Sequence, residues 1–271
     1  MELGKYGVLL VSRSPGEAKT LEPLRLLAAA INQRAGQVQV ETAIARGNEP
    51  VVQSGIDRLV ARGVQQIAIL PVDLFDEAAG GEHHPHQDVV FHYPGVAASY
   101  GRPLGLHTRL IRAVSESLRR AEDGWPKRDD SRTAVLVIGR GSTDPMKNAD
   151  LWKAARLIWE ETGYGMVECA FARQTSPNPS DGVLRCLQLG ARRVILLPYM
   201  LFPNSELKEL GGLVDEWRAM VPYADFLLAR PAGESVAPYL VDLFLEQAAR
   251  VWEEQRRGQR QDPYKSAAAG L

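Results

Sequence analysis

The chain repeats itself at a fixed spacing of 127 residues. The apolar segment YGVLLVSRS at residues 6–14 is matched by TAVLVIGRGS at residues 133–142, which pairs Arg13 with Arg140 (140 − 13 = 127). Further pairs keep the same spacing: Arg46 and Arg173, Pro50 and Pro177, Gly63 and Gly190, Pro71 and Pro198, and Leu74-Phe75 and Leu201-Phe202. A spacing kept over roughly sixty residues is much longer than the unit of a solenoid and indicates the duplication of a whole domain.

Each repeat alternates buried strands with amphipathic helices. The first elements expected in the two repeats are strands 7–12 and 134–139, helices 18–34 and 145–162, and strands 38–44 and 166–171. A helix ending near Gly63 or Gly190 and a third apolar strand, QQIAILP or RRVILLP, follow. This pattern is typical of parallel βαβ units covered on both faces. We therefore expect an α/β fold with two tandem, doubly wound parallel-sheet halves related by internal duplication.

The repeat also predicts where the domains begin and end. Residues 1–120 form the expected first half, residues 134–254 the second, and AEDGWPKRDDSRT at 121–133 the linker. Residues 255–271 contain few core-forming side chains, so they are expected to be a disordered tail.

Composition excludes several classes of protein. The 32 Lys and Arg residues nearly balance the 33 Asp and Glu residues, which gives no support for binding nucleic acid or a membrane surface. The N-terminal MELGKYGVLLVSRS lacks a basic region followed by a long apolar stretch, and it is interpreted as a first strand. No apolar run approaches the roughly 18 residues of a membrane span. Cys169 and Cys186 are expected to be small buried residues in a reducing compartment, so a cytoplasmic location is expected.

All five histidines lie between residues 83 and 107, and four of them lie in GGEHHPHQDVVFH at 80–92. Ligands of parallel α/β sheets bind at the carboxyl ends of the strands, where the loops of each half converge on one mouth. The histidines follow the third strand of the first half, so they are expected near such a mouth. The alternative is a solvated loop rich in Gly and Pro. His92 and His107 are expected to be structural.

Several segments resemble the CbiX/SirB-type sirohydrochlorin chelatases. GRGSTDPMKNADLWKAARL is similar to the GHGSRDP opening of that family, and GARRVILLPYMLF is similar to its third strand and following loop. HPHQDVVFHYPGVAASYGRPLG resembles the family segment that follows the third strand of the first half. The resemblance extends from residue 7 to about residue 245. It implies a two-lobed chelatase-like fold that inserts a divalent metal into a tetrapyrrole.

Carried over by position, the resemblance assigns roles to individual residues. His84 takes the place of the family's second histidine and is the expected catalytic proton acceptor and metal ligand. His83 and His86 are further metal-ligand candidates, since neutral imidazole suits Co, Ni and Fe. Asp88 lies four residues after His84 and is a substrate-binding candidate.

The family's other functional positions are replaced. Arg13 occupies the position of the family's first histidine, and Arg46 occupies the position of a carboxylate. In the second half, these two positions hold Arg140 and Arg173, and the position of the second histidine holds Glu206. A guanidinium group has no lone pair to bind a metal or accept a proton, but it pairs bidentately with carboxylates. Sirohydrochlorin has eight carboxylates, which Arg13 and Arg46 could bind. The full set of expected substrate-binding residues is Arg13, Ser14, Arg46, Asp88, Arg140 and Ser142.

Two further expectations concern the second half. GRGSTDP lacks both GxGxxG and a Walker lysine, so Gly139, Gly141 and Ser142 are expected to form a tight turn before a helix N-terminus able to bind an anion. Trp152 and Trp159 are expected to pack in the core or between helices.

The resemblance implies a chelatase that inserts Co²⁺ or Fe²⁺, with Ni²⁺ a further candidate, into sirohydrochlorin for cobalamin or siroheme synthesis. The metal is then a substrate, and no permanent cofactor is expected. One alternative is a non-catalytic tetrapyrrole carrier or regulatory protein of the same fold. Another is a metal-binding protein that uses only the histidine loop. The sequence leaves open whether the protein is a monomeric pseudo-dimer or a homo-oligomer.

Overall fold

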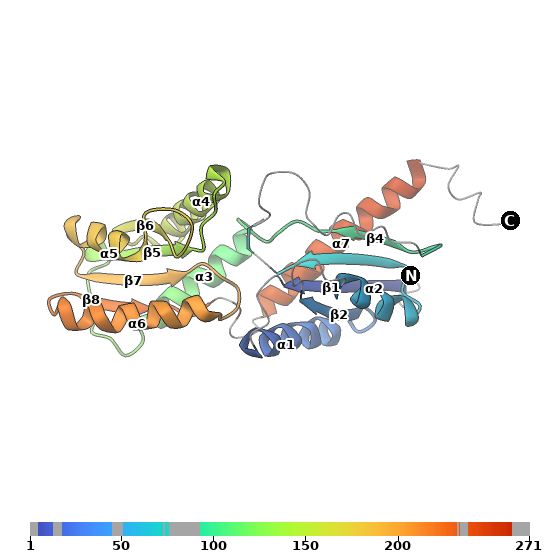
Figure 1. Ribbon diagram of the computed structural model, residues 1–271, viewed down its shortest axis with the longest axis horizontal. Helices are drawn as coiled ribbons and strands as arrows, with labels where there is room; N and C mark the ends of the chain where they lie inside the picture. The colour runs from blue at the N-terminus through green and yellow to red at the C-terminus, as the bar shows by residue number, and fades with distance from the viewer. Residues whose placement is uncertain are drawn as a thin grey trace. The chain divides into compact units, whose positions relative to one another are not determined.

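The computed structural model describes residues 5–12, 18–44, 51–72, 74–75, 93–231, 233 and 238–261. The chain divides into two compact units (Figure 1). The first comprises residues 1–73, 82–103 and 236–271, and the second comprises residues 74–81 and 104–235.

Each unit is built on a four-stranded parallel sheet, which confirms the expected fold class. The first sheet has the order β2-β1-β3-β4, with β1 at Tyr6–Ser12, β2 at Gln39–Ile44, β3 at Gln66–Pro71 and β4 at Ala97–Tyr100. The second has the order β6-β5-β7-β8, with β5 at Thr133–Gly139, β6 at Met166–Phe171, β7 at Arg193–Pro198 and β8 at Asp225–Leu228.

The strand registers confirm the duplication. Gly7 is paired with Gln39 in the first sheet, and Ala134 is paired with Met166 in the second, so both partners move by 127 residues. The spacing changes at the fourth strand, where Ala97 pairs with Gln66 but Asp225 pairs with Arg193 (225 − 97 = 128). The second repeat therefore gains one residue between its third and fourth strands.

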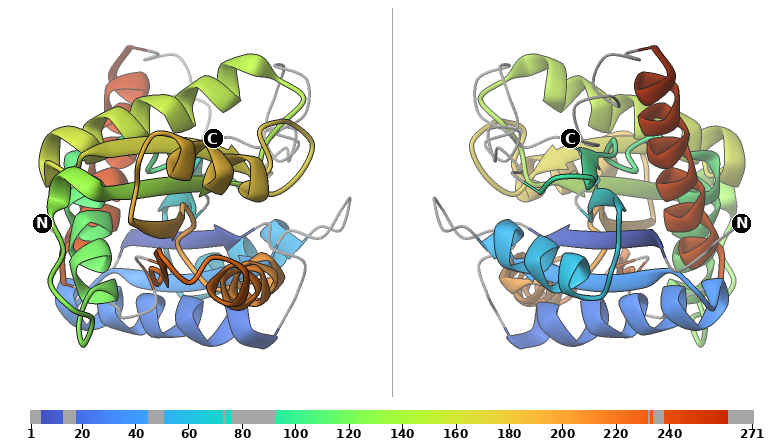
Figure 2. Two further views of the ribbon diagram at one scale, coloured as in Figure 1. Left: turned by 90° about the vertical axis from the view of Figure 1, so that its left-hand side faces the viewer. Right: turned by 90° about the vertical axis from the view of Figure 1, so that its right-hand side faces the viewer.

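Helices cover both faces of each sheet (Figure 2), as continuous apolar strands require. The first unit contains α1 at Ala18–Ala35, α2 at Val51–Ala61 and α7 at Pro238–Gln261. The second contains α3 at Thr108–Ala121, the short helix η2 at Asp130–Arg132, α4 at Pro145–Thr162, α5 at Pro179–Gln188 and α6 at Ser205–Met220. In the second unit, α5 and α6 enclose one core with the sheet, and α3 packs beside α4.

The final helix of each repeat belongs to the other repeat's unit. Helix α3 follows β4 in the chain but packs on α4 and β7, whereas α7 follows β8 but packs on β3, β4 and α1. The compact units therefore differ from the halves 1–120 and 134–254 drawn from the repeat.

Helix α7 also continues beyond residue 255, where a disordered tail was expected. Gln255 is buried, and its amide donates to the Ile67 carbonyl at 3.0 Å and to the Ala97 carbonyl at 3.4 Å. These bonds hold the helix on the sheet, and it ends at Gln261. Residues 262–271 lie outside the described residues.

A buried arginine ties the linker to the second sheet. The Arg193 side chain is 1% exposed and donates to Glu122 at 2.7 Å, to the Pro126 carbonyl at 2.6 Å and to Asp225 at 3.1 Å. Arg128 also pairs with Asp225. The residues expected to form a linker are thus packed against the amino ends of β7 and β8.

The remaining composition-based expectations concern cysteines and membranes. Cys169 and Cys186 are free and buried, as expected, and burial raises the pKa of both thiols to about 12. Within the part of the chain that the structure describes, no helix has the length and apolar character of a membrane span.

Candidate functional site

The second unit presents a mouth at the carboxyl ends of β5, β6 and β7. The turn after β5 and the loop after β6 are joined there by two backbone hydrogen bonds: Ala172 N donates to the Gly139 carbonyl at 2.9 Å, and Arg173 N donates to the Arg140 carbonyl at 2.8 Å. These bonds extend the β5–β6 pairing past the strands. They bring the backbones of Arg140 and Arg173 side by side, at the mouth on which these loops were expected to converge.

A glycine makes this close approach possible. Gly141 has φ +92°, and a Cβ atom at this position would lie 2.2 Å from the Arg173 carbonyl oxygen. Both the left-handed backbone and the contact exclude a larger residue. Gly139 is the last residue of β5, so of the three residues expected to form a tight turn only Gly141 and Ser142 lie in the connection to α4, and Gly141 gives it a left-handed backbone conformation.

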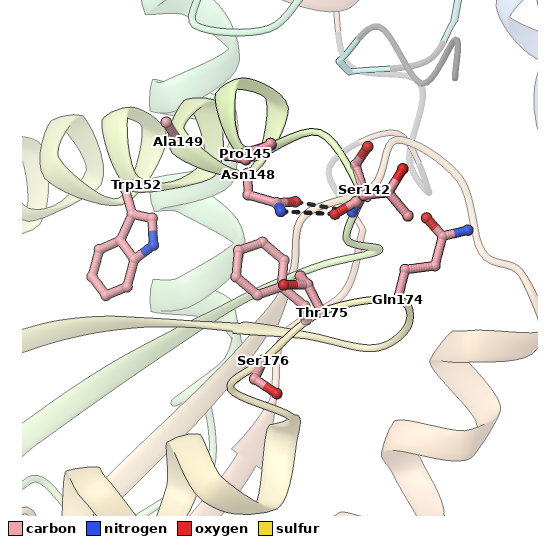
Figure 3. Close-up of a pocket in the computed structure, with 10 residues that line it drawn as sticks. Ser142, Pro145, Asn148, Ala149, Trp152, Gln174, Thr175 and Ser176 are labelled. Atoms are coloured by element: carbon pink, nitrogen blue, oxygen red, sulfur yellow. Dashed lines mark hydrogen bonds between the residues drawn. The ribbon is translucent and has the colours of Figure 1, made fainter. Parts of the chain in front are cut away.

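Polar side chains fix the start of α4. Asp144 is the N-cap, and its carboxylate accepts from Met146 N at 2.9 Å. The Asn148 side chain accepts from Ser142 N at 2.9 Å and donates to the Ser142 carbonyl at 2.8 Å (Figure 3). Ser142 is thereby held in place, while Asp144 already supplies a carboxylate at the helix N-terminus where an anion was expected.

A shallow pocket of about 560 Å³ lies beside this turn (Figure 3). The described residues that line it carry no formal charge, and they include Ser142, Thr143, Trp152, Phe171, Gln174 and Thr175. Ser142 and Trp152 come from the β5–α4 segment, and Gln174 comes from the loop after β6. This part of the mouth is suited to uncharged groups.

The prediction that Trp152 and Trp159 are packed in the core or between helices is wrong. They are 43% and 40% exposed, because the buried face of α4 is formed by Leu151, Ala154, Ala155 and Ile158. Trp152 lines the pocket, and the Arg156 guanidinium lies over the Trp159 ring at 5.4 Å from its centre.

A cluster of four charged residues forms the other part of the mouth. Glu206, at the start of α6, has a side chain that is only 11% exposed. Its Oε1 lies 3.9 Å from Arg140 Nε and 4.0 Å from Arg173 Nε. Arg173 also donates to both carboxylate oxygens of Glu209 at 2.6 Å, and this carboxylate raises the pKa of Arg173. Two guanidinium groups therefore converge on one buried carboxylate.

The sequence-predicted residues of the first half lie outside the described residues. This applies to Arg13, Ser14, Arg46, His83, His84, His86, Asp88 and His92. His107 is described: it is the N-cap of α3, and its Nδ1 accepts from Arg109 N at 3.2 Å, which confirms its structural role. Among the described residues, no group of three or more His, Cys, Asp or Glu side chains could hold a metal ion.

Two residues of this region were not found by sequence reasoning. Glu209 lies three positions after Glu206 on α6, a spacing that places both on one helix face and could have identified it. Tyr199 follows β7, stacks on Phe75 at 5.4 Å and donates to the Gly105 carbonyl at 3.0 Å. Burial raises the pKa of Tyr199, but a single tyrosine in an apolar segment gave no signal of this role.

Comparison with known proteins places this architecture among the chelatases. The CbiX family model matches residues 7–121 and 134–251. A sirohydrochlorin cobaltochelatase of Priestia megaterium is 37% identical over 196 residues, which cover 71% of this chain and 63% of that protein. A sirohydrochlorin ferrochelatase of the same organism is 30% identical over 163 residues, covering 59% of this chain and 60% of that protein. The chain thus spans about three fifths of the length of the curated relatives it matches.

Solved structures agree with the fold. SirB from Bacillus subtilis with Fe³⁺ has a TM-score of 0.74 and 24% identity, covering 91% of this chain and 95% of that chain. SirB from B. subtilis subspecies spizizenii in complex with cobalt has a TM-score of 0.70 and 20% identity, covering 94% and 98%. Since the family match extends over both repeats and most of the chain, this protein belongs to the CbiX family.

Proposed function

We propose that this protein is a sirohydrochlorin chelatase that inserts Co²⁺ or Fe²⁺ into the tetrapyrrole. The observation that carries the proposal is the family match through both repeats, together with relatives named for the cobalt and iron reactions. The strand registers support it, because they keep the repeat spacing through the three strands whose ends form each mouth.

The chemistry requires a metal ligand and a proton acceptor. As M²⁺ enters the macrocycle, its four nitrogens bind the metal and two pyrrole N–H protons leave, so charge is balanced. We assign metal delivery and proton acceptance to His84, because a neutral imidazole can do both near neutral pH. His83 and His86 are proposed as further ligands of the incoming metal.

Substrate binding is assigned to residues that can hold a ring of carboxylates. In the first half we propose Arg13, Ser14 and Arg46 for this task. Asp88 is proposed as a further substrate-binding residue, but not for the carboxylates, which its own charge repels. In the second half we propose Arg140, whose side chain is 48% exposed, and Ser142. Asn148 fixes the Ser142 backbone, which is a suitable arrangement for a positioned contact.

A non-catalytic tetrapyrrole carrier is the second candidate function. The charged cluster of the second mouth favours it, because guanidinium groups occupy two positions where the family resemblance implies a histidine and a carboxylate. Arg140 and Arg173 can bind a carboxylate but cannot accept a pyrrole proton. Arg13 and Arg46 occupy the same two positions in the first half, so neither half keeps the family's usual pair, and the protein could bind the tetrapyrrole without inserting a metal.

Anaerobic incubation with sirohydrochlorin and Co²⁺, Fe²⁺ or Ni²⁺ separates these functions. The absorption spectrum would be followed for the wild type, His84→Ala, the matched control His92→Ala and a blank without protein. A rate above the blank that is lost in His84→Ala and kept in His92→Ala supports a chelatase. A spectral shift without a rate for any metal indicates a carrier, and metal binding without any tetrapyrrole response indicates a metal-binding protein.

A further inference from the structure

Two guanidinium groups share one buried carboxylate at the second mouth. The Nε atoms of Arg140 and Arg173 lie 3.9 and 4.0 Å from Glu206 Oε1, which is about 1 Å longer than a hydrogen bond. Two positive groups this close repel each other, and a buried negative charge between them offsets that repulsion. Glu206 therefore holds the two arginines as a pair, while their side chains remain about half exposed at 48% and 47%.

The contact between Arg173 and Glu209 differs from the contacts to Glu206. The Glu209 side chain is 54% exposed, and both its oxygens accept from one terminal nitrogen of Arg173 at 2.6 Å. An exposed ion pair of this kind shifts an equilibrium by only about two- to fivefold. A carboxylate from outside the chain can therefore replace Glu209 on Arg173 with little loss of protein stability.

We propose that Arg140 and Arg173 form a carboxylate-binding subsite for a polycarboxylated ligand. Glu206 is its positioning residue, and Glu209 is an internal competitor that occupies Arg173 when no ligand is bound. The inference rests on the proposed function for its ligand, a tetrapyrrole with carboxylates around its rim, and assigns to the second unit the binding of that rim.

The geometry suits this ligand class. Backbone hydrogen bonds between the two loops fix Arg173 beside Arg140, and Gly141 allows the two loops to approach this closely. The two arginines are therefore arranged before a ligand binds, which lowers the cost of binding. Guanidinium groups bind carboxylates bidentately. A single carboxylate that replaces Glu209 on Arg173 binds weakly. A ligand with many carboxylates that contacts several sites at once gains affinity from each additional contact.

The uncharged pocket beside the turn extends the argument. Gln174 follows Arg173 directly and lines this pocket with Trp152 and Phe171. The mouth therefore combines positive groups with an aromatic, uncharged surface, as a macrocycle with an apolar centre and an acidic rim requires.

The test uses metal-free uroporphyrin I, a fluorescent tetrapyrrole with eight carboxylates, titrated into the full-length protein without added metal. Arg140→Gln and Arg173→Gln are expected to weaken binding about three- to tenfold each. The matched control is Arg185→Gln, an arginine on α5 that pairs with Glu168 away from the mouth. It should leave the affinity within about twofold of the wild type.

The two glutamates have opposite expected effects, which a purely structural ion-pair cluster would not produce. Glu209→Gln releases Arg173 and is expected to tighten binding about two- to fivefold, whereas the matched control Glu216→Gln on the same helix changes it by less. Glu206→Gln removes the charge that holds the arginines and is expected to weaken binding about threefold or more. A melting curve checks that Glu206→Gln is folded, and the exposed Glu209→Gln variant keeps the test valid if it is not.

The inference is overturned if uroporphyrin I does not bind the wild type, or if Arg173→Gln behaves as Arg185→Gln does. It is equally overturned if Glu209→Gln leaves the affinity unchanged or weakens it. Because metal is absent, a failure of chelation does not affect this result. Conversely, a chelating wild type whose arginine variants bind normally retains the proposed function and loses this subsite.

Discussion

Replacing Arg193 with methionine tests how the linker is attached to the second sheet. The Arg193 side chain is 1% exposed and pairs with Glu122 and Asp225, whose side chains are 25% and 16% exposed. Removing one partner of a buried ion pair costs about 3–5 kcal/mol, because the remaining charges stay buried without their partner. Since both carboxylates retain some contact with water and Asp225 keeps Arg128, we expect Arg193→Met to lower the free energy of unfolding by about 3 kcal/mol.

Urea unfolding followed by circular dichroism measures this loss. The matched control is Arg192→Met, the neighbouring arginine, which is exposed and stacks on Tyr223 at 5.3 Å. That substitution is expected to cost about 1 kcal/mol or less. Adding Asp225→Asn to Arg193→Met should recover part of the loss, because one uncompensated charge is removed. Equal, small effects of Arg193→Met and Arg192→Met would refute the reasoning.

Three further predictions concern the second unit. Gly141→Ala should lower the free energy of unfolding by about 2–3 kcal/mol, because the new Cβ would clash with the Arg173 carbonyl oxygen. Gly163→Ala, where φ is +73° but no atom lies within 4 Å of the new Cβ, should lower it by about 1 kcal/mol in the same urea titration. Trp152→Ala should change the free energy of unfolding little, because Trp152 is 43% exposed, whereas Trp217→Ala, at a position 7% exposed, should lower it by about 3–5 kcal/mol. Equal losses of stability in the two variants would contradict the assigned burial. The hydrogen bond from Arg128 lowers the pKa of Asp225 below its ordinary value in the folded state, and a weaker contribution from the Arg193 hydrogen bond acts in the same direction against the effect of burial. The stability from this carboxylate is present above the unfolded-state pKa and is lost as pH falls through the folded-state pKa, so Asp225→Asn should flatten the acid limb of a stability–pH curve; an unchanged limb would contradict this.

The fold was predictable because its signals are local and repeated. Apolar runs of strand length alternate with helical patterns, and the constant spacing from Arg13 to Arg140 extends the interpretation of one half to the other. The expected strand at 134–139 and helix at 145–162 agree with β5 and α4 within one residue at either end. Burial on both faces of a parallel sheet produces this strong pattern.

The exchange of the last helices was not predictable in the same way. Helices α3 and α7 occupy corresponding places in the two repeats, and each is amphipathic, so the sequence does not say which sheet each one covers. That choice depends on particular contacts, such as the bond from Gln255 to the Ile67 carbonyl and the pairing of Glu122 with Arg193. These contacts join residues far apart in the sequence.

At the candidate site, position could be predicted better than environment. The repeat placed Arg140, Arg173 and Glu206 at one mouth, and the structure brings them together. The repeat gave no sign that Glu206 is buried, because burial depends on contacts between segments that are far apart in the sequence. The exposure of Trp152 was missed for a related reason. The helical period defines an apolar face, but a large aromatic side chain at the margin of that face can be either buried or exposed to solvent.

The role of His84 is the central claim, and stopped-flow absorption of Co²⁺ insertion into sirohydrochlorin tests it most directly. The initial rate would be compared between the wild type and His84→Ala under anaerobic conditions, at equal and saturating concentrations of the tetrapyrrole. A positioned general base contributes about 10²–10⁴-fold to a rate, so His84→Ala should slow insertion at least about a hundredfold. A His84→Ala rate within about twofold of the wild type would contradict the account, because the proton acceptor would then lie elsewhere.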